Sequence, residues 1–330
     1  MSNYLTYEKN IRSEVLASLG DSLIKAYSKI YLWRSFLDLA IIYLMLFLVI
    51  FLTIKLHTLM GPWILIFTPL FALLSGAAFN WINVQLHEGS HYLLLPKRGL
   101  NDVYCNIFFG TLSLQHIDSY RAIHARHHAY LHSKKDPDLH IYDDYINFQK
   151  ALINDLFLIS AFKRHKEVKK FLFDNQLYLR SRKPFYMWVA TFIVQLGVIF
   201  AFVYFCGLWG IVYFCVFWLY GLLAIFPLLV RIRTVVQHYC IQNDVNGGIA
   251  TYTSRTTEAS FLELILIGAR MDYHFEHHIL PSIPYYHLKL IHRDLKKRGF
   301  FGAKLIEGME LATDSYLKFF YKLKIHRDII

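Results

Sequence analysis

The chain has 330 residues, of which 55% are hydrophobic and only 18% are charged. An ordinary soluble domain carries about 25% charged residues, so the composition argues against a soluble protein and indicates a membrane protein. The net charge of +11 favours a basic face over anionic lipid. We expect no nucleic-acid partner, because no basic patch interleaved with aromatic residues accompanies the charge.

Four long apolar runs predict membrane spans, at residues 35–54, 61–84, 186–207 and 209–230. Each run is long enough to cross a hydrocarbon core of about 30 Å at about 1.5 Å per helical residue. The first 34 residues lack the pattern of a secretory signal, which predicts an N-terminus that is not cleaved. We therefore expect one all-α integral membrane domain over residues 1–330, with four transmembrane helices in two hairpins.

The distribution of Lys and Arg predicts the orientation of these spans. Of the 35 such residues, 34 lie in residues 1–34, 91–185 and 231–330, and the exception is Lys55. Positively charged loops stay on the cytoplasmic side of a membrane. This pattern predicts a multi-pass protein with both termini in the cytoplasm, together with a helical cap formed by residues 85–185 and 231–330.

Several elements of this cap can be predicted. The apolar piece at residues 104–114 is too short to span, so we expect it at the membrane interface or packed under the cap. Residues 256–280 read as one helix, with Ser260 and Glu263 at the spacing of a capping box and "PSIP" ending it after Leu280, which places the third histidine box near a helix C-terminus. Residues 285–299 predict a basic amphipathic helix that Gly299 closes and that lies against lipid headgroups.

Three clusters of histidine lie beyond the ends of the predicted spans. "HEGSH", "HARHH" and "HFEHH" place histidines three and four residues apart, which puts each set on one face of a helix. They supply His87 and His91; His124, His127 and His128; and His274, His277 and His278. A zinc ion takes three or four protein ligands, so eight imidazoles indicate two metal ions. Imidazole suits iron, copper, zinc and nickel, and the spacing does not choose among them.

These clusters, separated by hydrophobic hairpins, resemble the three histidine boxes of the integral-membrane fatty acid desaturase and hydroxylase superfamily. "DPDL" at 136–139, "SRTTEA" at 254–259 and "YHFEHHILPSIPYYHL" at 273–288 are also similar to it, and the last two look most like its bacterial acyl-lipid branch. The resemblance covers residues 35–300. It implies a pair of iron ions as cofactor, O2 as co-substrate and a ninth ligand after the last span, which "RIRTVVQHYC" supplies as His238.

The sequence departs from one pattern of the superfamily. Stearoyl-CoA desaturases carry an asparagine four residues before the histidine that corresponds to His238, and it holds a metal-bound water. This chain has Thr234 at that position. The resemblance to the acyl-CoA branch is therefore weaker, and the water site is left open.

Acidic residues in or after the boxes are candidates to orient the metal ligands. Metal-bound histidines usually donate their second ring N–H to a carboxylate or carbonyl, which singles out Glu88, Asp136, Asp138 and Glu276. For Asp136, a solvated "KKDPD" turn is an equal alternative. Arg231 and Arg233 at the end of the last span are interpreted as snorkelling side chains. His132 and His140 are expected near the site or on the surface, and we expect no metal binding by His57, His116, His165, His287, His292 and His326.

The resemblance implies a membrane-bound, O2-dependent oxidoreductase, most closely an acyl-lipid desaturase that introduces a C=C bond into an acyl chain. Hydroxylation or ketolation of a lipid, alkane or carotenoid, or desaturation of a small secondary metabolite, stays open because box sequences do not separate these outcomes. A metal transporter is a remote alternative, since it would need polar ligands near the bilayer midplane.

Electrons for such a reaction must come from another protein. The sequence contains no GxGxxG dinucleotide fingerprint and no haem-binding His-Pro-Gly-Gly stretch, and its four cysteines form no CxxC pair. The resemblance therefore implies an external donor of the ferredoxin or cytochrome b5 type, which a basic face would attract if the donor is acidic.

Overall fold

The computed structural model of the chain describes residues 2–142, 147–174, 184–239, 254–301, 312–313 and 315–320. Regular structure within these ranges is helical apart from the two-residue strands β1 (Thr256–Thr257) and β2 (Ala312–Thr313), which pair in parallel. The prediction of a predominantly α-helical chain is confirmed. The side chains of His165 and His326 lie outside the described residues.

Packing divides the chain into two compact units. Residues 31–126 and 146–231 form the first, which contains the long apolar helices and is called the membrane unit below. Residues 1–30, 127–145 and 232–330 form the second, which contains both ends of the chain and is called the terminal unit. Two helices, α7 (Ile117–Tyr130) and α14 (Phe226–His238), begin in the membrane unit and end in the terminal unit.

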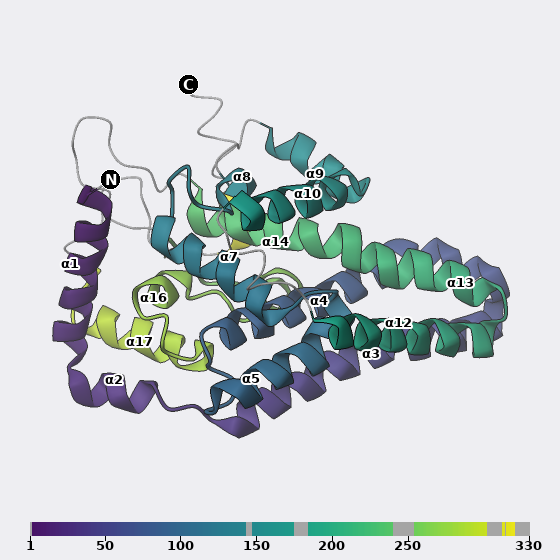
Figure 1. Cartoon of the computed structure of the whole chain (residues 1–330), viewed down its shortest axis with the longest axis horizontal. Coiled ribbons are helices and arrows are strands. Elements are labelled where there is room, and N and C mark those ends of the chain that lie inside the picture. The colour runs from purple at the N-terminus through teal and green to yellow at the C-terminus, as the bar shows by residue number, and fades with distance from the viewer. Residues whose placement is uncertain are drawn as a thin grey trace. The chain divides into compact units, whose positions relative to one another are not determined.

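Three helical stretches of the described chain are long and apolar enough to cross a membrane: Leu32–Ser90, Phe185–Cys206 and Trp209–His238. The first stretch turns back at Gly61, whose φ of 58° lies in a region that glycine adopts without steric cost. Figure 1 shows its two arms, α3 and α4, side by side. The stretches consist of α3 (Leu32–Met60), the 3₁₀ helix η1 (Gly61–Phe67) and α4 (Thr68–Ser90); α12 (Phe185–Cys206); and α13 (Trp209–Tyr213), the π-helical η3 (Phe214–Leu219) and η4 (Gly221–Ile225), and α14.

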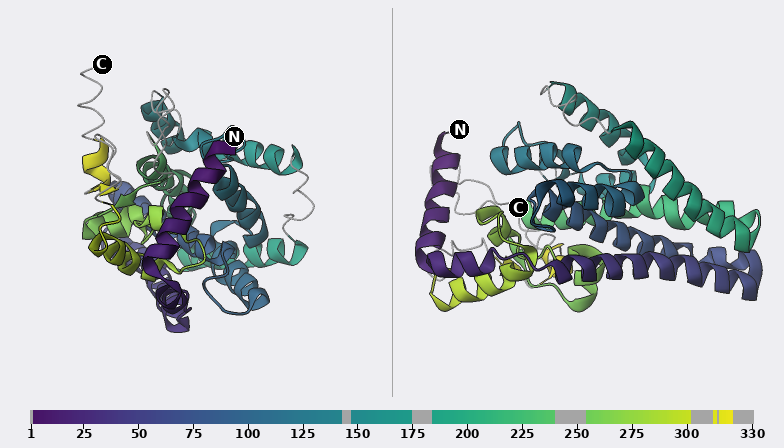
Figure 2. Two further views of the ribbon diagram at one scale, coloured as in Figure 1. Left: turned by 90° about the vertical axis from the view of Figure 1, so that its left-hand side faces the viewer. Right: turned by 60° about the horizontal axis from the view of Figure 1, so that its bottom comes forward.

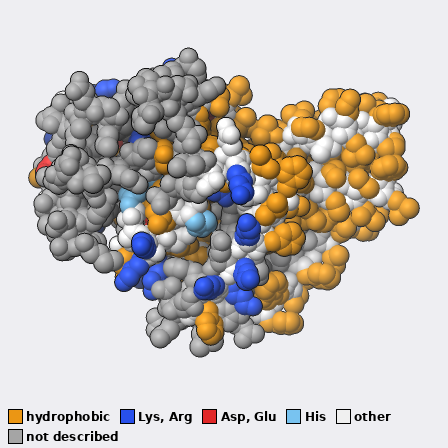
Figure 3. Space-filling view, turned by 90° about the horizontal axis from the view of Figure 1, so that it is seen from above, with side chains coloured by type: hydrophobic (Ala, Val, Ile, Leu, Met, Phe, Trp, Pro, Cys, Tyr) orange, Lys and Arg blue, Asp and Glu red, His pale blue; other side chains and the backbone are white. Residues whose placement is uncertain are grey.

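The surface of these helices is apolar. Large hydrophobic side chains such as Trp188, Phe192 and Phe200 are more than half exposed along α12, and Figure 3 shows hydrophobic side chains over this part of the molecule. A soluble monomer rarely exposes a continuous apolar surface of this kind. The chain is therefore a membrane protein. Three of the predicted spans fall within these stretches, and the span at 186–207 extends one residue beyond Cys206.

The short apolar piece predicted at residues 104–114 packs against the spanning helices. Tyr104 donates a hydrogen bond to the carbonyl oxygen of Ser35 at 2.9 Å, and Gln195 of α12 donates to the carbonyl oxygens of Thr111 and Leu112 at 3.2 and 3.1 Å. The piece is built from α5 (Arg98–Tyr104), the π-helical η2 (Cys105–Gly110) and α6 (Thr111–Ser113). The membrane unit is completed by the first part of α7, α9 (Phe148–Leu156) and α10 (Ile159–Asp174).

The prediction of a single helix over residues 256–280, in the terminal unit, is wrong. That stretch contains β1, α15 (Phe261–Glu263), the π-helical η5 (Leu264–Gly268) and α16 (His274–Ile279). Ala269 and Arg270 break the helix, with φ of 44° and 71°. The capping box of Ser260 and Glu263 is confirmed. The third histidine box thus has its own helix, which begins at His274, so the prediction that it ends a long helix is wrong.

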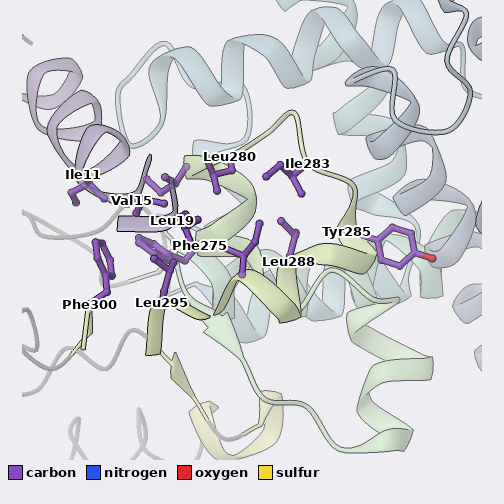
Figure 4. Close-up of a cluster of buried hydrophobic side chains, with 12 residues drawn as sticks. Ile11, Val15, Leu19, Phe275, Leu280, Ile283, Tyr285, Leu288, Leu295 and Phe300 are labelled. Carbon is purple, nitrogen blue, oxygen red and sulfur yellow. The ribbon is translucent and has the colours of Figure 1, made fainter. Parts of the chain in front are cut away.

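The predicted amphipathic helix is α17 (Tyr285–Lys297), and Gly299 follows it with φ of 72°. Its apolar face is buried against α1 (Ser2–Leu19) and α16, so the prediction that this helix lies on lipid headgroups is wrong for that face. Figure 4 shows the cluster, and Figure 2 shows α1 and α2 (Asp21–Tyr27) beside α17. The buried side chains are Ile11, Val15, Leu19, Phe275, Ile279, Leu280, Ile283, Tyr285, Leu288, Ile291, Leu295 and Phe300.

Truncation of Leu288 is expected to destabilise the terminal unit. The side chain is 1% exposed within the cluster, and large-to-small changes at such sites cost about 2–5 kcal/mol. Leu288→Ala should lower the free energy of unfolding by an amount in that range, measured by denaturant unfolding in detergent. The neighbouring Lys289 is exposed, so Lys289→Ala should change it by about 0.5 kcal/mol or less. Equal effects of the two variants would contradict the packing.

Candidate metal centre

Four buried histidines of the terminal unit converge on one point. They come from α7, α14 and α16, and the nitrogen that each can offer to a metal lies within 4.8 Å of the other three. The Nε2 atom of His274 lies 2.9 Å from that of His238 and 3.1 Å from that of His278. The four residues, called the first cluster below, are His127, His238, His274 and His278.

The spacing of these nitrogens fits a bound metal ion. A metal–nitrogen distance of about 2.0–2.1 Å places neighbouring nitrogens about 2.8–3.4 Å apart in octahedral or tetrahedral coordination. The separations of 2.9 and 3.1 Å around His274 agree with this geometry. A set made only of imidazoles suits iron, copper, zinc or nickel and not magnesium or calcium.

His128 and His277 lie beside the first cluster. Their Nε2 atoms are 3.2 Å apart, and the side chain of His277 is fully buried. The rings of His128 and His278 have centroids 4.3 Å apart. All six predicted ligands of the terminal unit therefore lie together.

The remaining three predicted ligands form a second cluster, in the membrane unit. His87 lies in the last turn of α4, His91 directly follows that helix, and His124 lies on α7. The Nε2 atoms of His91 and His124 are 3.0 Å apart, and the rings of His87 and His124 have centroids 4.1 Å apart. The helix α7 thus supplies histidines to both clusters, His124 to the second and His127 to the first.

Arg121 secures the end of α4 that carries His87 and His91, a role that the sequence did not indicate. Its guanidinium donates to the carbonyl oxygens of Ser90 at 3.1 Å and Gly89 at 3.4 Å, which are among the carbonyls that a helix leaves without partners at its C-terminus. Asp102 and Asp118 form ion pairs with the same guanidinium. Its position three residues before His124, on the same helix, does not by itself reveal this contact.

Asp136 orients His127. The Oδ1 atom of Asp136 lies 3.0 Å from His127 Nδ1, while Oδ2 accepts a hydrogen bond from the Tyr142 hydroxyl. The alternative of a solvated turn is excluded, because Asp136 is 5% exposed. Asp138 contributes its backbone N–H to Asp136 Oδ1, and its carboxylate lies 3.7 Å from His127 Nδ1.

Burial keeps several of these imidazoles neutral, which is the state that binds a metal. It lowers the pKa of His274 and of His278 well below the ordinary value, and the charges that neighbouring histidines would carry lower it further. Burial, aided by the positive charge of Arg121, lowers the pKa of His91 to about 4. These nitrogens therefore remain unprotonated at neutral pH.

The pKa of His127 is shifted in the opposite direction, because this histidine is paired with Asp136. Burial by itself would lower the pKa of His127, but the hydrogen bond and negative charge of Asp136 outweigh it and raise that pKa. Burial would likewise raise the pKa of Asp136, but hydrogen bonds from His127 and Tyr142 outweigh it and lower that pKa. Asp136 is thus a carboxylate, which favours the tautomer of His127 that donates from Nδ1 and leaves Nε2 for a metal.

The two glutamates of the boxes have different surroundings. Glu276 lies 2.6 Å from Nδ1 of His292 on α17 and accepts a hydrogen bond from the Thr256 hydroxyl. These two contacts of Glu276 join α16 to α17 and β1, and one of them involves His292, which was expected to bind no metal. Glu88 is buried near the end of α4.

The other polar residues singled out by sequence have separate partners. His57 contacts the hydroxyl of Tyr213 at 2.7 Å, and the ring of His132 lies 6.0 Å from that of His238. Among the described residues, the metal-suited clusters do not include His57, His116, His132, His140, His287 or His292. The snorkelling interpretation of Arg231 is wrong, because this side chain is buried and pairs with Asp155 at 2.6 Å. Arg233 is also buried.

Comparison with known proteins identifies the family of this arrangement. The sequence model described as "Fatty acid desaturase" matches residues 61–303, which is well over half of the chain and includes every clustered histidine. A search of curated proteins finds no match to the sequence.

Replacing Asp136 is expected to weaken metal binding. Loss of a carboxylate that orients a ligating histidine typically costs about 10–100-fold in metal affinity, and Asp136→Asn should fall in that range when a chelator competes for the metal of the purified protein. Lys134→Gln is the matched control, since Lys134 is exposed in the same loop. An Asp136→Asn variant that holds its metal as tightly as the wild type would show that Asp136 does not orient a ligand.

Proposed function

We propose that this chain, which belongs to the fatty acid desaturase family, is an O2-dependent di-iron enzyme of the membrane that introduces a C=C bond into an acyl chain. The observation that carries the proposal is the convergence of histidine nitrogens, 2.9–3.2 Å apart, in and beside the two clusters. The family is one of oxidoreductases of the desaturase and hydroxylase type, and the residues of this chain fit the metal that such chemistry needs.

The ligands that we propose for the two iron ions are the nine clustered histidines. Neutral imidazoles suit iron, and nine of them supply more nitrogens than one ion can use. Residues of α7 contribute to both clusters. The set consists of His87, His91, His124, His127, His128, His238, His274, His277 and His278.

When bound, the iron pair would supply the oxidation of an unactivated C–H bond by O2, with two electrons and two protons taken up from outside. The residues of the chain hold and orient the metals and restrict water. His238, His274 and His278 are nearly inaccessible to solvent, which limits side reactions of the oxidant with water. Asp136 fixes the ring of His127, and Arg121 fixes the end of α4.

The substrate that we propose is a lipid-borne acyl chain. A membrane protein whose apolar helices contact lipid has direct access to such chains, and the similarity of the third box to the acyl-lipid branch favours them. The electron donor would be a separate protein of the ferredoxin or cytochrome b5 type. We propose a cytoplasmic site, because Lys and Arg fall almost entirely on that side of the predicted topology.

Hydroxylation or ketolation of a lipid, alkane or carotenoid, and desaturation of a small metabolite, are the alternatives. The same two clusters would serve all of these reactions, because the outcome depends on which carbon is placed near the metals and not on the ligands. Expression in a host with simple lipids, followed by mass spectrometry of fatty acids and metabolites, separates them by product.

Removing one buried ligand is expected to abolish the reaction without removing the protein from the membrane. His277→Ala deletes a fully buried imidazole whose Nε2 lies 3.2 Å from that of His128, so product should fall below detection while the amount of membrane-bound protein is unchanged. His140→Ala is the matched control, because His140 is exposed and contacts the carbonyl of Pro137; it should keep full activity.

Metal analysis of the same preparations tests the cofactor. The wild type and His140→Ala should contain iron at two ions per chain, and His277→Ala should contain less. Activity that is supported by zinc alone, or full activity of His277→Ala, would disprove the di-iron assignment.

A further inference from the structure

A segment near the C-terminus enters the terminal unit beside the metal-binding residues. Strand β2 pairs in parallel with β1, and residues 316–320 form a helical turn directly after it. Tyr316 in this turn is fully buried. The match to the desaturase family ends at residue 303, so this segment lies outside the part of the chain that the family model describes.

The segment makes polar contacts with the loop that precedes the third histidine box. The hydroxyl of Tyr316 donates to Oδ1 of Asp272 at 3.1 Å, two residues before His274. The backbone N–H of Leu317 donates to Oε1 of Glu263 at 3.0 Å. Asp272 and Glu263 are both buried, where a polar group without a partner costs about 1–3 kcal/mol. These contacts therefore give hydrogen-bond donors to two buried carboxylates, Glu263 before the break at Ala269 and Asp272 after it.

The same loop is tied to the end of α14, which carries His238. Asp272 accepts a hydrogen bond on its carbonyl oxygen from Thr257 of β1 at 2.8 Å. Arg255 donates its backbone N–H to the carbonyl of Gln237, and Gln237 donates its side-chain amide to the carbonyl of Met271 at 2.7 Å. A short chain of hydrogen bonds thus connects the residues next to His238 with the residues next to His274.

The Asp272 carboxylate is packed tightly between Gly268 and Tyr316. A Cβ atom added to Gly268 would lie 2.2 Å from Asp272 Oδ1 and 3.3 Å from a ring carbon of Tyr316. The absence of a side chain at Gly268 is what lets the carboxylate reach the hydroxyl. Arg255 adds a second contact to the segment, with its guanidinium 4.9 Å from the ring centre of Phe319.

We propose that Tyr316 is a positioning residue of the metal centre: its hydroxyl holds the Asp272 carboxylate, and the loop fixed in this way keeps His274 in place against His238. The Nε2 atoms of these two histidines are 2.9 Å apart, and a ligand that starts a six-residue helix directly after a break depends on the preceding loop for its position. The inference rests on the proposed metal function of the first cluster.

The test compares Tyr316→Phe with Tyr286→Phe in the purified full-length protein. Both changes remove one hydroxyl and keep the ring, but the Tyr286 hydroxyl donates an exposed hydrogen bond to the carbonyl oxygen of Lys29, at 3.4 Å. The affinity for iron is measured by competition with a chelator, and the electronic spectrum of the bound iron is recorded. Tyr316→Phe removes a hydrogen bond that holds the loop before His274, so it should bind iron about tenfold more weakly, at the lower end of the loss seen when a direct partner of a ligand is removed, with an altered spectrum.

Gly268→Ala is a second, independent variant that acts on the same contact. Its added methyl group displaces the Asp272 carboxylate and should change affinity and spectrum in the same direction as Tyr316→Phe. Tyr286→Phe should match the wild type in both measurements.

The outcomes separate this inference from the proposed function. If the wild type itself binds no iron, the proposed function fails. If the wild type binds iron and Tyr316→Phe equals it in affinity and spectrum, only the role of Tyr316 is disproved. The role is also disproved if Tyr316→Phe reduces the yield of folded protein while the folded fraction holds iron as the wild type does, because Tyr316 would then be purely structural.

Discussion

The structure depends on keeping the four buried histidine side chains of the first cluster in close contact with one another. Polar nitrogens lose their contact with water on burial, and that loss is costly unless each nitrogen has a partner. In the first cluster, His274 faces His238 at 2.9 Å and His278 at 3.1 Å. These are side chains of one chemical kind, and charging them would add repulsion to the cost of desolvation. The lowered pKa values of His274 and His278 follow from the same burial and proximity.

Side chains around the clusters form hydrogen bonds and ion pairs with the helices that carry the histidines, and these interactions fix the positions of the histidine rings. Arg121 satisfies carbonyls at the end of α4, Asp136 and Tyr142 hold the ring of His127, and Glu276 joins α16 to His292 of α17. These interactions are charged or charge-assisted hydrogen bonds, which are stronger and more directional than neutral ones. The hydrophobic cluster of α1, α16 and α17 then fixes α16 from its other side.

The sequence was sufficient to find the histidines but not the path of the chain between them. Helical spacing made His124, His127 and His128 recognisable, because a helix of any tertiary context places those positions on one face. The break at Ala269 and Arg270 was missed, since both residues are good helix formers and the backbone there is set by the contacts of Asp272. The contact between Glu276 and His292 was not predicted for a similar reason, because the two residues lie on different helices and sequence spacing does not reveal such a pair.

The burial of α17 could not be read from its own sequence either. An amphipathic pattern shows that one face needs to be covered, and it does not show whether lipid headgroups or another helix covers it. The covering residues, Val15 and Leu19 among them, lie in α1, more than 250 residues away in the chain. Interactions at that distance in sequence are set by the fold as a whole.

The chemistry of the clusters also explains why acidic residues surround them. Histidine is a neutral ligand, so metal cations held only by imidazoles would place uncompensated positive charge in a buried region, which is unfavourable. Asp136 is buried and ionised, and its hydrogen bond to His127 brings negative charge to the edge of the first cluster without occupying a coordination position. Because Asp136 contacts the Nδ1 atom of His127, it can balance positive charge in the buried region while the Nε2 atom of that histidine stays available to a metal.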